Sequence, residues 1–357
     1  EPADIGERQQ ELLMQLKEGA QTTAMADRLT ARKQEAAAES FKRKLALVQQ
    51  TQGVDAAALA QTAEAAGYKR FWVAEHHAMD GVAGGAASVV LAHIGQATQS
   101  IRIGSGGIML PNHNPFVIAE QFGTLDALFP GRIDLGLGRA PGADARFGQA
   151  LRKDLHRAAE YFPQDVVELR ALFTGEPELQ IRATPGFGAQ VEMWILGSSL
   201  FGAQLAAALG MPYAFASHFA PDYLDQAIEL YRKQFRPSQW LDKPHVMAAM
   251  TVIAAEDDEE AALLGTSMDQ SFVALRSGTP GRLKPPVPGY RQSLPPSMLA
   301  MLEHMRQASA VGGLEKVRAD LTRFVERTGA DEIIVSGATY DPAMRRRSLE
   351  LTAKAVA

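Results

Sequence analysis

The sequence predicts an α/β fold in which a parallel sheet closes into a (β/α)8 barrel. Short apolar runs, typical of strands that are buried on both faces, recur along the chain, and helical patterns separate them. Such alternation is typical of parallel strands joined by right-handed crossovers. The length of 357 residues is one that a single barrel of this kind commonly uses.

Seven apolar runs are predicted to form strands. They are Arg70–Val73, Ile101–Leu110, Ile133–Leu137, Met193–Leu196, Tyr213–Ala216, Val246–Ala254 and Glu332–Val335. Helices are predicted between them, at residues 54–66, 85–98, 115–129, 155–173, 200–209, 221–235 and 257–275. The ambiguous stretch LALV at residues 45–48 would be a further, first strand. With that strand the count favours a closed TIM barrel over an open sheet.

Two stretches depart from this alternation. Residues 1–43 are rich in Ala, Gln, Glu and Lys, so we predict a helix-prone arm there and a barrel domain over residues 44–357. The arm is interpreted as a surface helix or mobile segment, or as an oligomerisation arm. Residues 277–297 are dense in Pro and Gly and come after the strand at Val246–Ala254, which is the seventh when residues 45–48 are counted as the first. We predict an inserted loop, either a lid over the site or a passive excursion.

Composition narrows the possible functions. The net charge of -5 argues against nucleic-acid binding, and the absence of cysteine excludes disulfides, thiolate metal sites and a cysteine nucleophile. No apolar run approaches the roughly 20 residues of a membrane span, and no signal-peptide pattern is present. We therefore expect a cytoplasmic protein. Rossmann, P-loop and serine-hydrolase motifs are missing from the sequence.

Candidate catalytic residues follow the first clear strand, where the sequence reads Glu75-His76-His77. Residues at the carboxyl ends of barrel strands face the active-site mouth, and a histidine that titrates near neutral pH suits proton transfer. One of the pair could instead form a hydrogen bond in the core. Adjacent strand residues point to opposite sides, so no metal site is predicted for this pair.

Candidate anion-binding residues follow two later strands. Arg139 ends the strand at Ile133–Leu137 and offers a seat for a phosphate or carboxylate, or else forms a structural ion pair. Ser198 and Ser199 lie where a strand runs into a helix N-terminus, which favours anion binding, although an ordinary serine N-cap also fits. Glycines in the strand at Ile101–Leu110 suggest backbone close to a flat ligand or an unusual peptide geometry.

Four phrases of the sequence resemble the bacterial-luciferase-like flavin monooxygenases, and in particular their single-chain bacterial subgroup. The phrases are WVAEHH (72–77), IGSGGIMLPNHNPFVIAEQFGTLDALFPGRIDLGLGRAPG (103–142), WILGSSLFGAQLAAALGMPYAFASHFAP (194–221) and GADEIIVSG (329–337). The resemblance implies a barrel that uses O2 and reduced FMN, supplied by an NAD(P)H-dependent flavin reductase. It implies oxygenation of a small organic substrate, such as an aldehyde or other carbonyl compound, by a homodimer.

The resemblance also implies roles for the candidate residues. His76 corresponds to the catalytic histidine of the family, and His77 to its neighbour in the pocket. Arg139 and Ser199 correspond to ligands of the flavin phosphate, with Ser198 beside them. Gly106-Gly107 falls where the family has a non-proline cis peptide under the flavin ring.

One departure concerns the start of the chain. Members of this subgroup begin with a strand of the form SVLDL-x-P that helps to line the pocket, and that motif is absent here. The identity of the first barrel strand therefore stays open. Two other functions also stay open: a deazaflavin-dependent dehydrogenase of the same superfamily, and a barrel that binds flavin without catalysis.

Overall fold

The computed structural model describes residues 56–82, 84–140, 145–176 and 180–356, all of which belong to the second of the chain's two units, residues 51–357. The helix-prone arm predicted at residues 1–43 and the strand predicted at residues 45–48 lie outside the described residues. We find no membrane-spanning candidate among the described helices.

The described residues contain an eight-stranded parallel sheet surrounded by helices, which confirms the predicted fold class. Its strands are β1 (Arg70–Val73), β2 (Arg102–Met109), β3 (Ile133–Gly138), β4 (Glu192–Gly197), β5 (Tyr213–Phe215), β6 (Val246–Ala254), β7 (Ser309–Gly312) and β8 (Glu332–Ser336). All seven strands predicted with clear patterns are present. The additional strand is β7, whose four residues, SAVG, are too small and too few to give a strand pattern.

The strand β6 organises the second half of the sheet because it pairs with three others. It pairs with β5 through its first residues, with β7 through its last residues, and with β8 in between. Thr251 is the register partner of both Ser309 in β7 and Ser336 in β8, so these two strands lie at opposite edges of β6. All nine β6 residues are buried, as expected for a strand that is covered on both faces and both edges.

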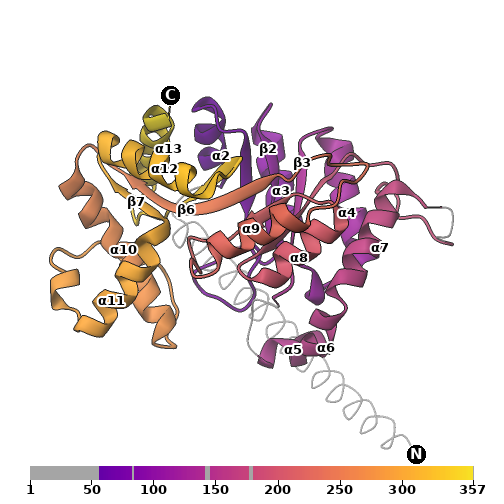
Figure 1. Ribbon diagram of the computed structural model, residues 1–357, viewed down its shortest axis with the longest axis horizontal. Coiled ribbons are helices and arrows are strands. Elements are labelled where there is room, and N and C mark those ends of the chain that lie inside the picture. The colour runs from indigo at the N-terminus through magenta and orange to yellow at the C-terminus, as the bar shows by residue number, and fades with distance from the viewer. Residues whose placement is uncertain (1–55, 83, 141–144, 177–179, 357) are drawn as a thin grey trace, which may run out of the picture. The chain divides into compact units, whose positions relative to one another are not determined.

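Helices lie between consecutive strands and cover the sheet. Those that match predicted segments are α2 (Ala56–Ala65), α3 (Ala87–Ala97), α4 (Pro115–Leu128), α6 (Leu155–Glu160), α7 (Phe162–Thr174), α8 (Leu200–Leu209), α9 (Leu224–Gln234) and α10 (Asp258–Arg276). The others are α5 (Ala145–Leu151), α11 (Pro296–Met305), α12 (Leu314–Thr328) and α13 (Pro342–Val356). Figure 1 shows α10 and α11 at the side of this unit away from α4 and α7.

The helix predicted at residues 155–173 is in fact two helices, α6 and α7, that meet at Tyr161. Pro163 is the cause, because proline has no backbone N–H and fits only the first turn of a helix, and α7 indeed carries its proline there. The single-helix prediction was therefore wrong at this point, although both halves are helical.

The Pro- and Gly-rich stretch predicted at residues 277–297 separates α10 from α11. From Ser277 to Pro295 it contains no strand and only one short 3-10 helix, Arg291–Ser293. Its first residues, Ser277 to Thr279, donate backbone hydrogen bonds to the last turn of α10, and Arg291 Nε lies 3.8 Å from Asp269 Oδ2 of the same helix. Two further hydrogen bonds join its middle to α10. The Val287 N–H donates to Thr266 Oγ1 at 2.9 Å, and the Gln270 side-chain amide donates to the Pro285 carbonyl at 2.8 Å.

The interior of the barrel is apolar in its middle and charged at the amino ends of the strands. Trp194, Ala214 and Met247 are buried together in the middle, with Trp72 packed against them. At the amino ends, Arg70 Nη1 lies 2.8 Å from Asp134 Oδ2 of β3, and Arg70 Nε lies 2.8 Å from Glu332 Oε2 of β8. Arg70 therefore links β1 to β8, two strands that do not pair with each other in the described residues.

Candidate active site

The candidate residues gather at the carboxyl ends of the first four strands. The register is level there: Met109 of β2 pairs with Gly138 of β3, which pairs with Leu196 of β4. Residues that follow these positions therefore share one rim, and in a parallel barrel that rim is the active-site side. Glu75, His76 and His77 follow β1, Arg139 follows β3, and Ser198 and Ser199 follow β4.

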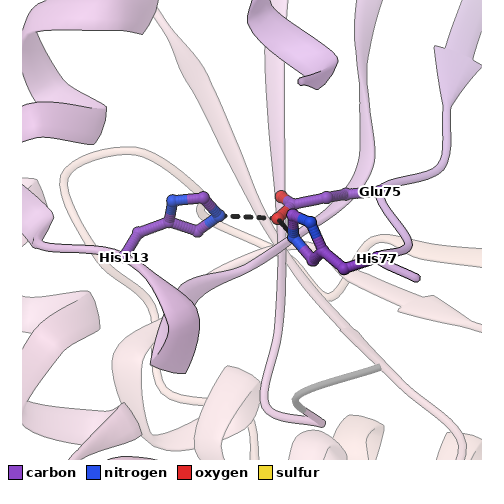
Figure 2. A group of neighbouring side chains, drawn as sticks. All are labelled: Glu75, His77 and His113. Atoms are coloured by element: carbon purple, nitrogen blue, oxygen red, sulfur yellow. Dashed lines mark hydrogen bonds and ion pairs between the residues drawn. The ribbon is translucent and has the colours of Figure 1, made fainter. Parts of the chain in front are cut away.

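Glu75 occupies the centre of one part of this rim and is 1% exposed. Its Oε1 lies 2.5 Å from His77 Nε2 and 2.6 Å from His113 Nε2, while the Met109 N–H donates to Oε2 at 3.3 Å. Figure 2 shows the two imidazole rings reaching the same carboxylate from different directions. Burial opposes the charged carboxylate, but the hydrogen bonds from His113 and His77 outweigh it and hold the pKa of Glu75 below its usual value.

The two neighbouring histidines have different surroundings. His77 contacts Glu75, and its ring stacks on Phe147 with centroids 4.6 Å apart and planes inclined by 15°. His76 Nδ1 is buried and has no hydrogen-bond partner among the described residues. Burial lowers the pKa of His76. His77 is thus a fixed wall of the site, whereas His76 keeps a nitrogen that a ligand or substrate could engage.

Arg139 and the start of α8 form a second part of the rim. The guanidinium carbon of Arg139 lies 4.0 Å from the centroid of the Phe201 ring, in the first turn of α8. Ser199 is the N-cap of α8, but its side chain makes no capping hydrogen bond. Arg139 is exposed and makes no ion pair with the described carboxylates, so the ion-pair alternative is not observed. A cation, a hydroxyl and free helix N–H groups therefore lie together, which is the donor set of an anion site.

The glycines of β2 lie where other strands come very close. The peptide bond between Gly106 and Gly107 is cis, the geometry that the family resemblance implied. A Cβ on Gly107 would lie 2.6 Å from the Gly136 carbonyl oxygen, and one on Gly106 would lie 3.0 Å from Trp72 Cε3. A side chain is therefore excluded from Gly107 by the β3 backbone, and at Gly106 it would press tightly on the Trp72 side chain.

His218, which follows β5, belongs to the same side of the sheet. Its Nδ1 is buried without a hydrogen-bond partner in the described part of the chain. Burial lowers the pKa of His218 to about 4, so the ring is neutral at neutral pH. A neutral imidazole suits a pocket wall better than a proton donor.

The sequence interpretation missed two residues of the site, His113 and Phe147. His113 follows β2 and could have been found by the same strand-end argument that selected His76 and Arg139. Phe147 lies in α5, which follows β3 in the chain, and its ring contacts His77, a residue 70 positions earlier. No periodicity or motif in the sequence predicts that contact.

The family of luciferase-like monooxygenases matches residues 38–332. A luciferase-like monooxygenase of Escherichia coli (strain K12) is 49% identical over 294 residues, which cover 82% of this chain and 88% of that protein.

Solved structures show the same similarity in three dimensions. The crystal structure of apo-MsnO8 is 32% identical, has a TM-score of 0.76, and covers 85% of this chain and 92% of the other. The oxygenating constituent of 3,6-diketocamphane monooxygenase from Pseudomonas putida, solved in complex with FMN, is 19% identical with a TM-score of 0.62. The match covers 85% of this chain and 92% of that one, and at this identity it shows the fold alone. The family match and the 49% identical relative together place the chain in the luciferase-like monooxygenase family.

Proposed function

We propose that this protein is an FMN-dependent monooxygenase that uses reduced FMN and O2 to oxygenate a small organic substrate, such as an aldehyde or other carbonyl compound. An NAD(P)H-dependent flavin reductase supplies the reduced FMN. The observation that carries the proposal is the stacking of Arg139 on Phe201 beside the uncapped N-terminus of α8. It leaves a cation and helix N–H groups free for a phosphate at the rim of the barrel.

The residues present fit the phosphate of FMN. Arg139 would form a charge-assisted hydrogen bond with it, and Ser198 and Ser199 would add hydroxyl groups beside the N–H groups of α8. Because the guanidinium is already stacked on Phe201, less side-chain entropy is lost when it binds an anion.

The ring of the flavin fits beside β2. The family resemblance puts the flavin ring at the peptide between Gly106 and Gly107, and this peptide bond is cis in the structure. The mouth of a barrel and the convergent polar groups at strand ends are common features of cofactor sites.

Bound reduced FMN supplies the electrons with which O2 is activated. The chain supplies proton transfer and a dry site. His76 is our candidate for the catalytic histidine, because its buried Nδ1 has no partner in the described residues and its lowered pKa keeps the ring able to accept a proton near pH 7. His77 and Phe147 stack to form a wall that helps to exclude water from this side.

The loop at residues 277–295 is proposed to act as a lid. Beyond Thr279 its contacts with α10 are side-chain interactions, the hydrogen bonds to Thr266 and Gln270 and the ion pair of Arg291 with Asp269, and these can break without unfolding α10. The homodimer stays a prediction that follows from the family resemblance, and the cytoplasmic location stays a prediction made from the sequence pattern.

The proposed function is tested by binding under anaerobic conditions. The full chain is titrated with reduced FMN and with reduced riboflavin, which has the same ring but no phosphate. We expect one FMN per chain and much weaker riboflavin binding, followed by slower reoxidation of bound than of free FMN when O2 is admitted. Equal affinity for both flavins would contradict the phosphate site.

A reduced deazaflavin coenzyme is the third ligand in this experiment. Tight binding of it, with hydride transfer to a carbonyl compound and no use of O2, would support the dehydrogenase alternative. Absence of binding for all three ligands would contradict a flavin function altogether.

A further inference from the structure

We propose that Glu75, His77 and His113, here called the Glu75 triad, bind a divalent transition-metal ion of the Zn²⁺ class at the rim of the barrel. This site goes beyond the proposed monooxygenase function, which requires no metal. The sequence predicted no metal site for the pair His76 and His77. The site proposed here uses His77 with Glu75 and His113 instead.

The triad has the donor atoms that such an ion prefers. Its donor atoms, a carboxylate oxygen and two imidazole nitrogens, all lie within 4.8 Å of one another. Zn²⁺ and its neighbours are commonly held by His nitrogens together with one carboxylate, whereas Ca²⁺ and Mg²⁺ prefer oxygen ligands alone. In Figure 2, the His113 and His77 rings lie on different sides of the Glu75 carboxylate, so both rings can bind an ion placed beside that carboxylate.

Small side-chain movements are enough to admit the ion. Bonds of about 2.1 Å in a tetrahedral arrangement place ligand atoms roughly 3.4 Å apart. Without metal, Glu75 Oε1 is 2.5 Å from His77 Nε2 and 2.6 Å from His113 Nε2, so each ring must withdraw by less than about 1 Å. The proton on each Nε2 moves to Nδ1 or to solvent, and the ion takes its place against the carboxylate.

Surrounding groups already orient each ligand. The Met109 N–H donates to Glu75 Oε2, the oxygen that the histidines leave free. Phe147 stacks on the His77 ring, and the Lys153 ammonium donates to the His113 carbonyl at 2.8 Å. The first two contacts hold the Glu75 carboxylate and the His77 ring in place before an ion arrives, and the third holds the backbone of His113.

The carboxylate of the triad is buried, whereas its two histidines are partly exposed, which suits a metal site with one coordination position open to water. The Glu75 side chain is 1% exposed, whereas those of His77 and His113 are 16% and 26% exposed. The carboxylate that supplies the negative charge is therefore shielded from water, which strengthens its attraction for a cation. The exposed edges of the histidines leave a path for the ion and room for a water ligand.

The experiment uses the untagged full chain after treatment with a chelator. ZnCl2 is titrated by calorimetry, and CoCl2 by visible absorption, which reports the coordination geometry of Co²⁺. We expect one ion per chain and a low-coordinate cobalt spectrum. The substitutions His113→Asn and Glu75→Gln should each weaken binding by at least tenfold, a loss expected when a ligand is removed.

A matched control comes from α6, where the His156 side chain is 93% exposed and lies 3.8 Å from Glu160. His156→Asn should leave metal affinity unchanged. Circular dichroism checks that each variant folds, and His77→Asn replaces Glu75→Gln if that variant does not. Absence of binding at millimolar Zn²⁺, or binding that survives all the triad substitutions, would overturn the proposal and leave a hydrogen-bonded triad only.

The result is independent of the flavin proposal. Metal binding is measured without flavin, and flavin binding is measured in the presence of the chelator. Failure of either one therefore leaves the other standing.

Discussion

At the residue scale, the side chains of the rim are held by contacts that leave their polar ends available. Arg139 stacks on Phe201 instead of pairing with a carboxylate, and His76 has a buried nitrogen without a partner in the described residues. At the opposite end of the barrel, by contrast, the buried Arg70 is paired with Asp134 and Glu332. A buried polar group without a partner costs stability, so the free nitrogen of His76 at the rim points to a ligand that completes it.

The first prediction concerns Arg139. Replacing it with Ala should weaken FMN binding by about 1.5–3 kcal/mol, because one charge-assisted hydrogen bond is lost. Fluorescence titration with FMN measures the change. Arg236→Ala is the control, since Arg236 is also exposed but lies after α9, at the amino ends of the strands. Unchanged affinity in Arg139→Ala would remove Arg139 from the site.

The second prediction concerns His76. His76→Ala should lower turnover of a carbonyl substrate by about 10²–10⁴-fold, the usual contribution of a general acid or base, while FMN affinity stays largely intact. Because burial lowers the pKa of His76 from 6.5, its acid limb in the pH profile should lie below pH 6.5 and be absent in the variant. Loss of folding in His76→Ala, seen by circular dichroism, would instead indicate a structural role.

At the element scale, β2 depends on glycine because two strands press against it. A Cβ built on Gly104, Gly106 or Gly107 would lie 2.5, 3.0 or 2.6 Å from the nearest atom of a neighbouring strand. A distance under 3.0 Å is too short for a Cβ. The same strand carries a register shift against β3 between Ser105 and Ile108. The glycines predicted backbone close to a flat ligand or an unusual peptide geometry, whereas the register shift and the neighbouring strands are seen only in the structure.

The third prediction concerns this strand. Gly107→Ala should lower the free energy of unfolding by about 1–3 kcal/mol, because the new Cβ meets backbone atoms of Gly136 that cannot move aside. Urea unfolding followed by tryptophan fluorescence measures the loss. Gly138→Ala is the matched control, since its Cβ would have only an ordinary contact, 3.7 Å from the Ile108 carbonyl oxygen. Equal loss in both variants would argue against this close approach.

At the scale of the whole molecule, charged side chains join strands that are not paired with each other. Glu332 at the start of β8 accepts hydrogen bonds from Lys69 at 2.6 Å, Arg70 at 2.8 Å and His245 at 2.9 Å. Burial favours the neutral carboxyl of Glu332, but hydrogen bonds from His245, Arg70 and Lys69 outweigh it. The pKa of Glu332 is therefore well below its usual value.

The fourth prediction uses this pKa. A carboxylate with a depressed pKa in the folded state stabilises the fold fully above its unfolded pKa of 4.5, and the stabilisation is lost as the pH falls below that value. Glu332→Gln should therefore cost about 1.5–3 kcal/mol at pH 7, and the difference from the parent chain should shrink below pH 4.5.

Unfolding in urea at several pH values measures this dependence. Glu229→Gln, at an exposed position of α9, should change neither the stability nor its pH profile. A constant difference between Glu332→Gln and the parent chain across the acid range would contradict the assignment.

The sequence alone determined seven of the eight described strands, most of the described helices and the positions of Arg139, Ser198, Ser199 and His76 just after strand ends. Hydrophobic periodicity and strand ends are local properties, and parallel strands bring their carboxyl ends to one edge. Tertiary structure alone decided the pairing of β6 with three strands, the meeting of His113 with Glu75, and the stacking of Phe147 on His77. These contacts join segments that are distant in the chain, and their partners are selected by packing, which no local pattern records.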